Sequence, residues 1–224
     1  MYFQEALQIC SRDQLPEDWA MIQNNLGLAY SDRVQGEQSE NIEAAIICYQ
    51  AALEIWTCQA FPEKWAVQQY NLGSAYSERI QGERRDNLEQ AITCYELALE
   101  VYTFSAYPER WAITQHKLAN LYKNRIQGKK ADNQEQAIAY YQAALEVYTL
   151  SIYPAQWAAT QHNLASGYKD RIQGKKSDNQ EQGIAYYQAA LEVYTLSIYP
   201  AQWAATQYNL ANIYDNRIQG KKAD

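Results

Sequence analysis

Residues 154–174 read PAQWAATQHNLASGYKDRIQG, and the pattern returns 46 residues later, at residues 200–220, as PAQWAATQYNLANIYDNRIQG. All prolines and five of the six tryptophans keep this spacing of 46: Pro16, Pro62, Pro108, Pro154, Pro200, Trp19, Trp65, Trp111, Trp157 and Trp203. A fixed period of this size is typical of repeat proteins, in which each copy packs against its neighbours. We therefore predict one repeat domain over residues 1–224, with half a helix at residues 1–12 and then units that begin near each proline, about 4.5 copies in total.

Each copy carries the signals of two helices. Proline suits the first position of a helix and glycine the residue after its end, so Pro62 and Gly82 frame a first helix of about nineteen residues. Asp86 and Glu89 have the spacing of a capping box, which predicts a second helix that runs to about Thr103. Apolar residues recur there every three or four positions, as on one buried helical face, and no strand pattern competes. Stacked pairs of this kind predict an all-α fold, a right-handed α-solenoid.

The composition excludes several classes of protein. The chain has 224 residues, 47% of them hydrophobic and 20% charged, which is too apolar for a disordered protein and too interrupted by charge for a membrane span. The net charge of -7 argues against a protein whose main task is to bind nucleic acid. The four cysteines show no paired spacing for zinc or for a disulfide framework, and no secretory signal opens the chain, so we expect a cytoplasmic location.

Two segments of one copy resemble a known family. Residues 71–76, NLGSAY, followed by residues 91–98, AITCYELA, resemble the tetratricopeptide repeat, although the usual unit of that family is about 34 residues. Later copies carry Ala119, Ala165 and Ala211 in place of Gly73, which keeps a small residue for close helix packing. Long repeats of this kind are similar to arrays in bacterial, especially cyanobacterial, proteins and in kinesin light chains. The resemblance implies a scaffold that binds a protein or peptide.

Catalytic and metal-binding constellations are absent from the sequence. The two histidines, His116 and His162, occupy equivalent places in adjacent copies, so their backbones should lie at least about 10 Å apart, too far for a shared metal. The Gly-Lys-Lys segments that begin at Gly128 and Gly174 lack the spacing of a phosphate-binding loop. We therefore predict no enzyme activity, no cofactor and no metal site.

A basic edge offers one alternative function, the binding of anions or nucleic acid. The loops between the helices carry paired cations, with an arginine near the end of each first helix: Arg84, Arg85, Lys129, Lys130, Lys175, Lys176, Lys221 and Lys222, with Arg79, Arg125, Arg171 and Arg217. The opposing interpretation is that these residues only solvate the loops and pair with carbonyl groups at helix ends.

The last two copies differ at seven of 46 positions, and five of these lie on the first helix. At about 100° per residue, Leu164, Tyr168 and Ile172 share the buried face of Trp157. Four of the five differences lie on the opposite, exposed stripe, which in helix-pair repeats of the resembled family lines the concave surface: His162/Tyr208, Ser166/Asn212, Lys169/Asp215 and Asp170/Asn216. We interpret this variation as adaptation to a ligand, with free drift as the alternative.

Asparagine recurs beside that stripe although it is a poor residue for a helix interior. The row consists of Asn25, Asn71, Asn163 and Asn209, with Lys117 in the third copy. In tetratricopeptide domains a matching asparagine often holds the backbone of a bound peptide, and a hydrogen bond to the next repeat explains the row equally well. The predicted peptide-binding residues are this row, the side-chain row Tyr70, His116, His162 and Tyr208, and the flanking Asn120, Ser166, Asn212, Lys169 and Asp215.

The sequence thus supports binding of a protein or peptide, with His162 titrating near pH 6.5 if its environment leaves it unperturbed. A structural spacer or a self-assembling segment of a larger bacterial signalling protein is the alternative. In that case we expect the apolar face of the last helix, with Leu210 and Tyr214, to be uncovered and copies to associate end to end.

Overall fold

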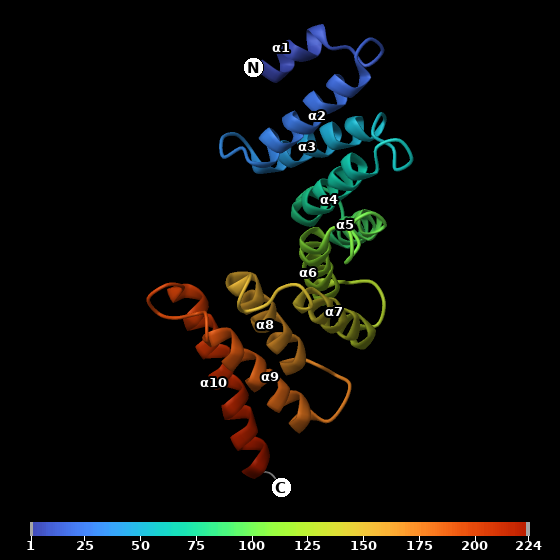
Figure 1. The fold of residues 1–224 in the computed structure, drawn as a ribbon. Coiled ribbons are helices and arrows are strands. Elements are labelled where there is room, and N and C mark those ends of the chain that lie inside the picture. The colour runs from blue at the N-terminus through green and yellow to red at the C-terminus, as the bar shows by residue number, and fades with distance from the viewer. Residues whose placement is uncertain (1, 223–224) are drawn as a thin grey trace. The chain divides into compact units, whose positions relative to one another are not determined.

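The computed structural model describes the backbone of residues 2–222 and the side chains of residues 5–7 and 9–217. All regular structure in this range is helical (Figure 1), in the order α1 (Tyr2–Ile9), α2 (Pro16–Ser31), α3 (Gln38–Leu53), α4 (Pro62–Glu78), α5 (Arg84–Leu99), α6 (Pro108–Asn124), α7 (Lys130–Leu145), α8 (Pro154–Lys169), α9 (Lys176–Leu191) and α10 (Pro200–Lys222). Within the described residues, none of these helices is long and apolar enough to cross a membrane.

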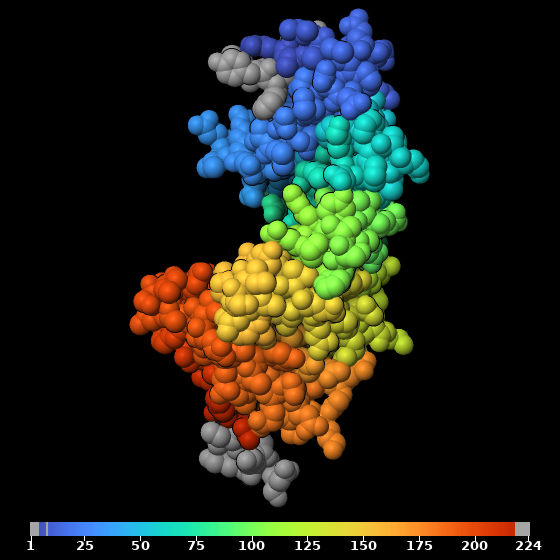
Figure 2. Space-filling view, in the orientation of Figure 1, coloured from blue at the N-terminus to red at the C-terminus, as the bar shows by residue number. Residues whose placement is uncertain are grey.

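The helices form two compact units, residues 1–107 with α1 to α5 and residues 108–224 with α6 to α10. We call the helix that begins at each proline the A helix and the one that follows it the B helix. Each A helix packs on its own B helix, and each B helix packs on the next A helix of its unit; α10 (red), for example, lies along α9 (orange) in Figure 2. This arrangement confirms the all-α solenoid of helix pairs. A single domain over residues 1–224 stays a prediction.

The helix ends agree with the sequence signals only in part. Proline opens the A helices, and the glycine after each of the first four has a left-handed backbone with φ between 78° and 86°. The A helix α4 ends at Glu78, however, and α5 begins at Arg84 after Glu83, without a side-chain cap. The expected capping box at Asp86 is therefore wrong, since Asp86 lies inside the first turn, where its charge favours the positive helix end.

A buried asparagine holds the turn between the helices instead. Asn87 Nδ2 donates to the carbonyl oxygens of Gln81, at 2.8 Å, and Arg79, at 3.3 Å. The equivalent residues do the same in the other described turns, and we call the four of them the turn asparagines: Asn41, Asn87, Asn133 and Asn179. They satisfy carbonyl groups that the end of an A helix leaves without a helical partner.

Helix α10 differs from the other A helices because it continues to Lys222. The expectation that Gly220 follows a helix end, as Gly174 does, is therefore wrong.

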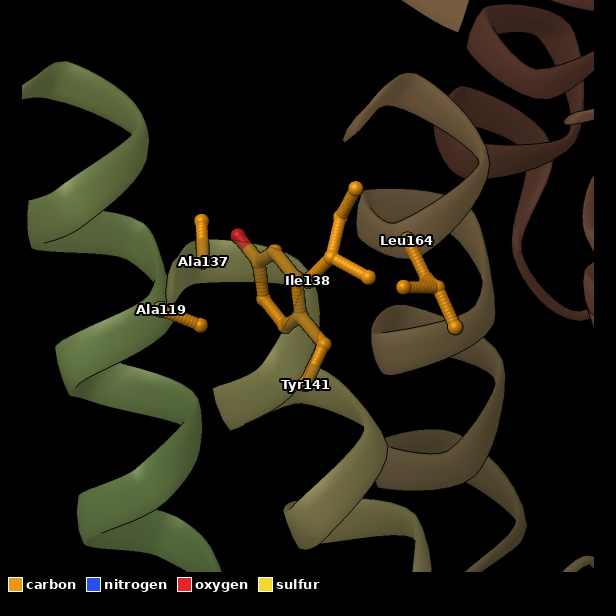
Figure 3. Close-up of a cluster of buried hydrophobic side chains, with 5 residues drawn as sticks. All are labelled: Ala119, Ala137, Ile138, Tyr141 and Leu164. Carbon is orange, nitrogen blue, oxygen red and sulfur yellow. The ribbon is translucent and has the colours of Figure 1, made fainter. Parts of the chain in front are cut away.

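The core depends on a tyrosine from each B helix. The ring of Tyr141, with no exposed surface, lies against Ala119 of α6, beside Ile138 and Leu164 (Figure 3). In the first unit the contact is tighter, because a methyl group on Gly73 would lie 2.9 Å from the Tyr95 ring. This close approach explains the small residue at that position of the A helix.

The predicted buried face of α8 is confirmed at Leu164, which is fully buried, whereas Trp157 and Tyr168 are half-buried. The prediction for Ile172 is wrong, since this residue is 58% exposed. The reason is that α8 ends at Lys169, so Ile172 belongs to the turn and no longer follows the helical period.

We expect Asn133→Ala to reduce the free energy of unfolding by about 1–3 kcal/mol, because the carbonyl groups of Arg125 and Gln127 lose their buried donor. Urea denaturation followed by circular dichroism measures the change. The matched control is Gln136→Ala, an exposed residue of the same helix, which should change the midpoint little. Equal midpoints for the two variants would contradict the role given to the turn asparagines.

Candidate functional site

The two histidines link neighbouring A helices. His116 Nδ1 lies 2.9 Å from Thr160 Oγ1, and His162 Nδ1 lies 2.8 Å from Thr206 Oγ1. Each threonine hydroxyl already donates its hydrogen to the carbonyl group four residues earlier in its own helix. The imidazole Nδ1 must therefore carry a hydrogen and donate it to the threonine. In His116 the other nitrogen, Nε2, accepts from the Asn163 amide at 3.4 Å.

Burial keeps these rings neutral. Desolvation, with a smaller effect of the Lys117 charge, lowers the pKa of His116 to about 4. Desolvation also lowers the pKa of His162, where the charges of Lys123 and Lys169 act in the same direction. The condition for titration of His162 near pH 6.5, an unperturbed environment, is therefore not met, because the neighbouring A helix covers its ring.

The first unit makes the same link with other residues. Gln68 Nε2 donates to Asn24 Oδ1 at 2.7 Å, and Asn24 and Gln68 are 44 residues apart, as are His116 and Thr160. Asn24 and Gln68 of the first unit are thus replaced by His116 and Thr160 in the second, and both pairs are 44 residues apart. This constant separation is visible in the sequence, but the helical angles of a single helix do not show it. The variation at these positions therefore serves the packing of one A helix on the next.

The ring members of the row also pack on the core. Tyr70 meets Tyr95 with the ring centroids 5.4 Å apart, and His116 and His162 meet Tyr141 and Tyr187 at 5.4 and 5.2 Å, all edge to face. Tyr208 stands apart from these residues, since it is 70% exposed. Of the predicted side-chain row, Tyr208 therefore offers the largest free surface.

The asparagine row is largely bonded to the protein itself. Asn163 Nδ2 donates to Asn120 Oδ1, at 3.4 Å, as well as to the imidazole. Asn209 Oδ1 accepts from Lys169, and Asn25 Oδ1 accepts from Asn24. Asn163 and Asn209 thus bond to a neighbouring A helix, which was the alternative explanation of their recurrence. In the described part of the chain, Asn71 Nδ2 is buried without a hydrogen-bond partner.

The variable stripe is less exposed than its helical angles suggested. Ser166 accepts from Lys123 at 3.0 Å, and Lys169 donates to Asn209 at 3.4 Å. His162, Ser166 and Lys169 are half-buried, so their prediction as exposed residues is wrong; Asp170 is exposed as expected. Hydrogen bonds to the neighbouring A helices, α6 and α10, cover these side chains, and the angles within one helix do not include this effect.

The remaining predicted residues have different environments. Asn120 Oδ1 accepts from the Tyr141 hydroxyl at 2.6 Å and so helps to hold the core ring. Lys117 and Asn212 are half-buried, and Asp215 is exposed.

A small groove lies between α8 and α10. It encloses about 130 Å³ and is lined by Ala159, His162, Asn163, Tyr194, Gln202 and Ala205. It brings together two predicted binding residues, His162 and Asn163, with two small apolar residues at its walls. Amide groups beside apolar surface can hold the backbone and one side chain of an extended segment.

The basic edge is partly neutralised. Arg79 and Arg171 each form two hydrogen bonds of 2.7–2.8 Å with a B-helix glutamate, Glu43 and Glu135, and Arg217 lies 2.7 Å from Glu181. Sequence reasoning missed these glutamates, although their constant separation of 36 residues is visible. Lys129 and Lys175 remain exposed, and the side chains of Lys221 and Lys222 lie outside the described residues.

Among the described side chains, no group of three or more histidine, cysteine, aspartate or glutamate residues is placed to hold a metal ion. The buried cysteines keep their thiols protonated and are therefore poor nucleophiles, since desolvation raises the pKa of Cys48 to about 11 and that of Cys94 to about 12.

The lowered pKa of His116 predicts an acid-dependent loss of stability. Above about pH 6.5 the imidazole is neutral in both the folded and the unfolded chain. As the pH falls from there toward about 4, the unfolded chain binds a proton that the folded chain does not, and stability should fall by up to about 3 kcal/mol. Denaturation at a series of pH values measures this change.

The control is the double variant His116→Asn with Thr160→Gln, which copies the Asn24–Gln68 link of the first unit and has no titrating group at this position. It should lose this part of the pH dependence. A double variant with the same pH profile as the wild type would refute the explanation.

Four segments of the chain match the family model described as the Sel1 repeat, at residues 20–54, 69–100, 112–146 and 158–192. Each match begins in an A helix and ends at the end of its B helix, and together they cover more than half of the chain. No curated protein matches the sequence. Repeats of this tetratricopeptide-like family are non-catalytic scaffolds that generally mediate protein–protein interactions. The finer identification as a tetratricopeptide repeat of 46 residues stays a prediction, whereas the chain belongs to the Sel1 repeat family.

Proposed function

We propose that the chain is a protein-interaction scaffold that binds an extended protein segment on the A-helix surface of its second unit. The observation that carries this proposal is the groove of about 130 Å³ between α8 and α10, which contains His162 and Asn163. Its size suits one side chain of a bound segment. The cytoplasmic location expected from the sequence belongs to this proposal.

The chemistry of the groove supports an extended ligand. Asn163 bonds through Nδ2 within the protein and can accept through Oδ1, while the Gln202 amide can both donate and accept, as the backbone of an extended segment requires. Ala159 and Ala205 leave room for an apolar side chain beside Tyr194, which is 7% exposed. Four further predicted contacts, Tyr208, Asn209, Asn212 and Asp215, lie on α10 and belong to the proposed surface.

A structural alternative rests on the exposed face of α10. Ala204, Gln207 and Ala211 are exposed, whereas the equivalent Ala158, Gln161 and Ala165 of α8 are buried. Tyr214 is 38% exposed as expected, but Leu210 is only 8% exposed, because it packs in a cluster with Ile184 of α9. The face is therefore mostly small and polar, and a second copy of the chain is its proposed partner.

The groove can be tested with peptides selected from a random library on the full chain. Ala205→Leu should fill the groove and weaken the selected peptides at least about tenfold, since one displaced contact is worth about 1.4 kcal/mol or more. Asn163→Ala should weaken them by about 1–3 kcal/mol. Calorimetry measures both affinities. Ala139→Leu, at an exposed alanine of α7, is the matched control and should leave binding unchanged.

If the peptides bind the Ala205→Leu variant as tightly as they bind the wild type, the groove is not their binding site. Loss of binding after substitution of Lys129 and Lys175, together with steep weakening by salt, would favour the basic edge instead.

Self-association can be tested by sedimentation over a wide range of protein concentrations. If a second copy covers the α10 face, the average mass should rise with concentration, and Ala211→Glu should abolish the rise by placing a charge in the contact. Ala139→Glu is the control. A monomer at every concentration would eliminate this alternative.

A further inference from the structure

A larger cavity of the second unit, which we call the α6–α8 pocket, lies among three consecutive helices. It encloses about 340 Å³. Lys123 lines it from α6, Lys130 and Tyr141 from α7, and Ser166 and Gly167 from α8. It shares no lining residue with the groove between α8 and α10, so its role is independent of the proposed function.

The pocket is open because position 167 is glycine. A methyl group built on Gly167 would meet only Ile138 within 4 Å, at an ordinary contact distance of 3.4 Å. In the next repeat the equivalent residue is Ile213, which is 1% exposed and lies so close to Gly183 that a methyl group there would be 3.0 Å from Ile213 Cδ1. The Gly183–Ile213 pair therefore fills the space that the Ala137–Gly167 pair leaves open.

The lysines are not required by the packing of this region. A pocket of about 290 Å³ in the first unit shares four lining positions with it, and there Ser31 and Gln38 replace Lys123 and Lys130, while Arg33 lines it from the turn. The next repeat carries the same two cations, as Lys169 and Lys176, but there Ile213 fills the corresponding space. The combination of two lysines with an open pocket therefore distinguishes this repeat, and it indicates a chemical role for Lys123 and Lys130.

The charges of the pocket have a positive excess. Lys123 and Lys130 face one carboxylate, that of Asp170. Lys123 Nζ donates one hydrogen to Ser166 Oγ at 3.0 Å, which leaves two N–H groups. Desolvation lowers the pKa of Lys123, and Lys169 lowers it further, while Asp170 raises it. Although Lys123 is an exposed residue, its ammonium group lies near a second cation, Lys169, and its two remaining N–H groups can donate to a bound anion.

Hydrogen bonds fix the backbone around Asp170, so this side of the pocket is formed without a ligand. Gln134 Nε2 donates to the Asp170 carbonyl oxygen at 2.7 Å, and Gln134 Oε1 accepts from the backbone N–H of Ile172 at 3.1 Å. These two bonds fix the end of α8 on α7. A site that is already formed loses little conformational freedom on binding.

We propose that the α6–α8 pocket binds the carboxylate group of a short aliphatic acid, either a free organic acid or an acidic side chain of another protein. Two ammonium groups against one carboxylate match a single negative charge, whereas a phosphate dianion would be repelled by Asp170. Ala137 and Gly167 line the pocket with small residues, which leaves room for the aliphatic part. The volume, at the lower end of ligand pockets, fits a small group.

The test is a titration of the full chain followed by amide resonances, with four probes: butyrate, inorganic phosphate, a capped alanine peptide with one central glutamate, and the same peptide with glutamine. Butyrate and the glutamate peptide should give saturable shifts at Gly167 and its neighbours. Phosphate and the glutamine peptide should bind at least about tenfold more weakly, the usual effect of losing a charge-assisted hydrogen bond.

Two variants locate the site. Lys123→Gln should weaken butyrate at least about tenfold. The double variant Ala137→Gly with Gly167→Ile copies the Gly183–Ile213 pair, so it should fold like the wild type and lose binding because the pocket is filled. Lys129→Gln, an exposed lysine outside the pocket, is the control and should bind butyrate normally.

Tighter binding of the glutamate peptide than of butyrate would assign the carboxylate to a protein partner, and the reverse order to a free acid; both results support the pocket. The proposal is overturned if butyrate gives no saturable shift, if phosphate binds as tightly as butyrate, or if the folded variants bind butyrate like the wild type.

Discussion

The contact between a B-helix tyrosine ring and a small residue of its A helix sets the distance between the two helices of each pair. Gly27 and Gly73 take this place in the first unit and Ala119 and Ala165 in the second. A larger side chain would separate the helices and expose the ring, which in Tyr95, Tyr141 and Tyr187 has no exposed surface. Because an oversized residue in a packed core forces neighbouring groups apart, the turns and the links between repeats depend on this spacing.

Polar links with constant sequence separations then fix each repeat on the next. A turn asparagine bonds to carbonyl groups six and eight residues earlier, an arginine pairs with a glutamate 36 residues earlier, and a histidine or asparagine bonds to a residue 44 residues later. Each link joins groups that are at least partly buried, where an unpaired polar atom is costly. Together they specify which residues of neighbouring helices meet, which apolar contacts alone do not.

The sequence was sufficient to predict the helix pairs, the proline at the helix start, the left-handed glycine in the turn and the buried Leu164, because these follow from local rules of the chain. It was not sufficient for the exposure of His162 and Lys169, because a helical angle describes one helix and omits the neighbouring A helix. The α6–α8 pocket was not predicted either, although Gly167 is one of the differences between the last two copies. Its effect depends on Ala137, which lies on another helix.

The paired differences Ala137–Gly167 and Gly183–Ile213 affect how such an array can change its length. Residues 138–161 and 184–207 are identical, so genetic recombination within them removes or adds one whole repeat. In the shortened chain, Ala137 packs against Ile213, and its methyl group lies about 3.0 Å from the isoleucine. In the lengthened chain, Gly183 packs against a second copy of Gly167, which leaves a void. The two copies are therefore not interchangeable modules despite their similarity, because exchange within this segment leaves either a tight contact or a void at the new junction.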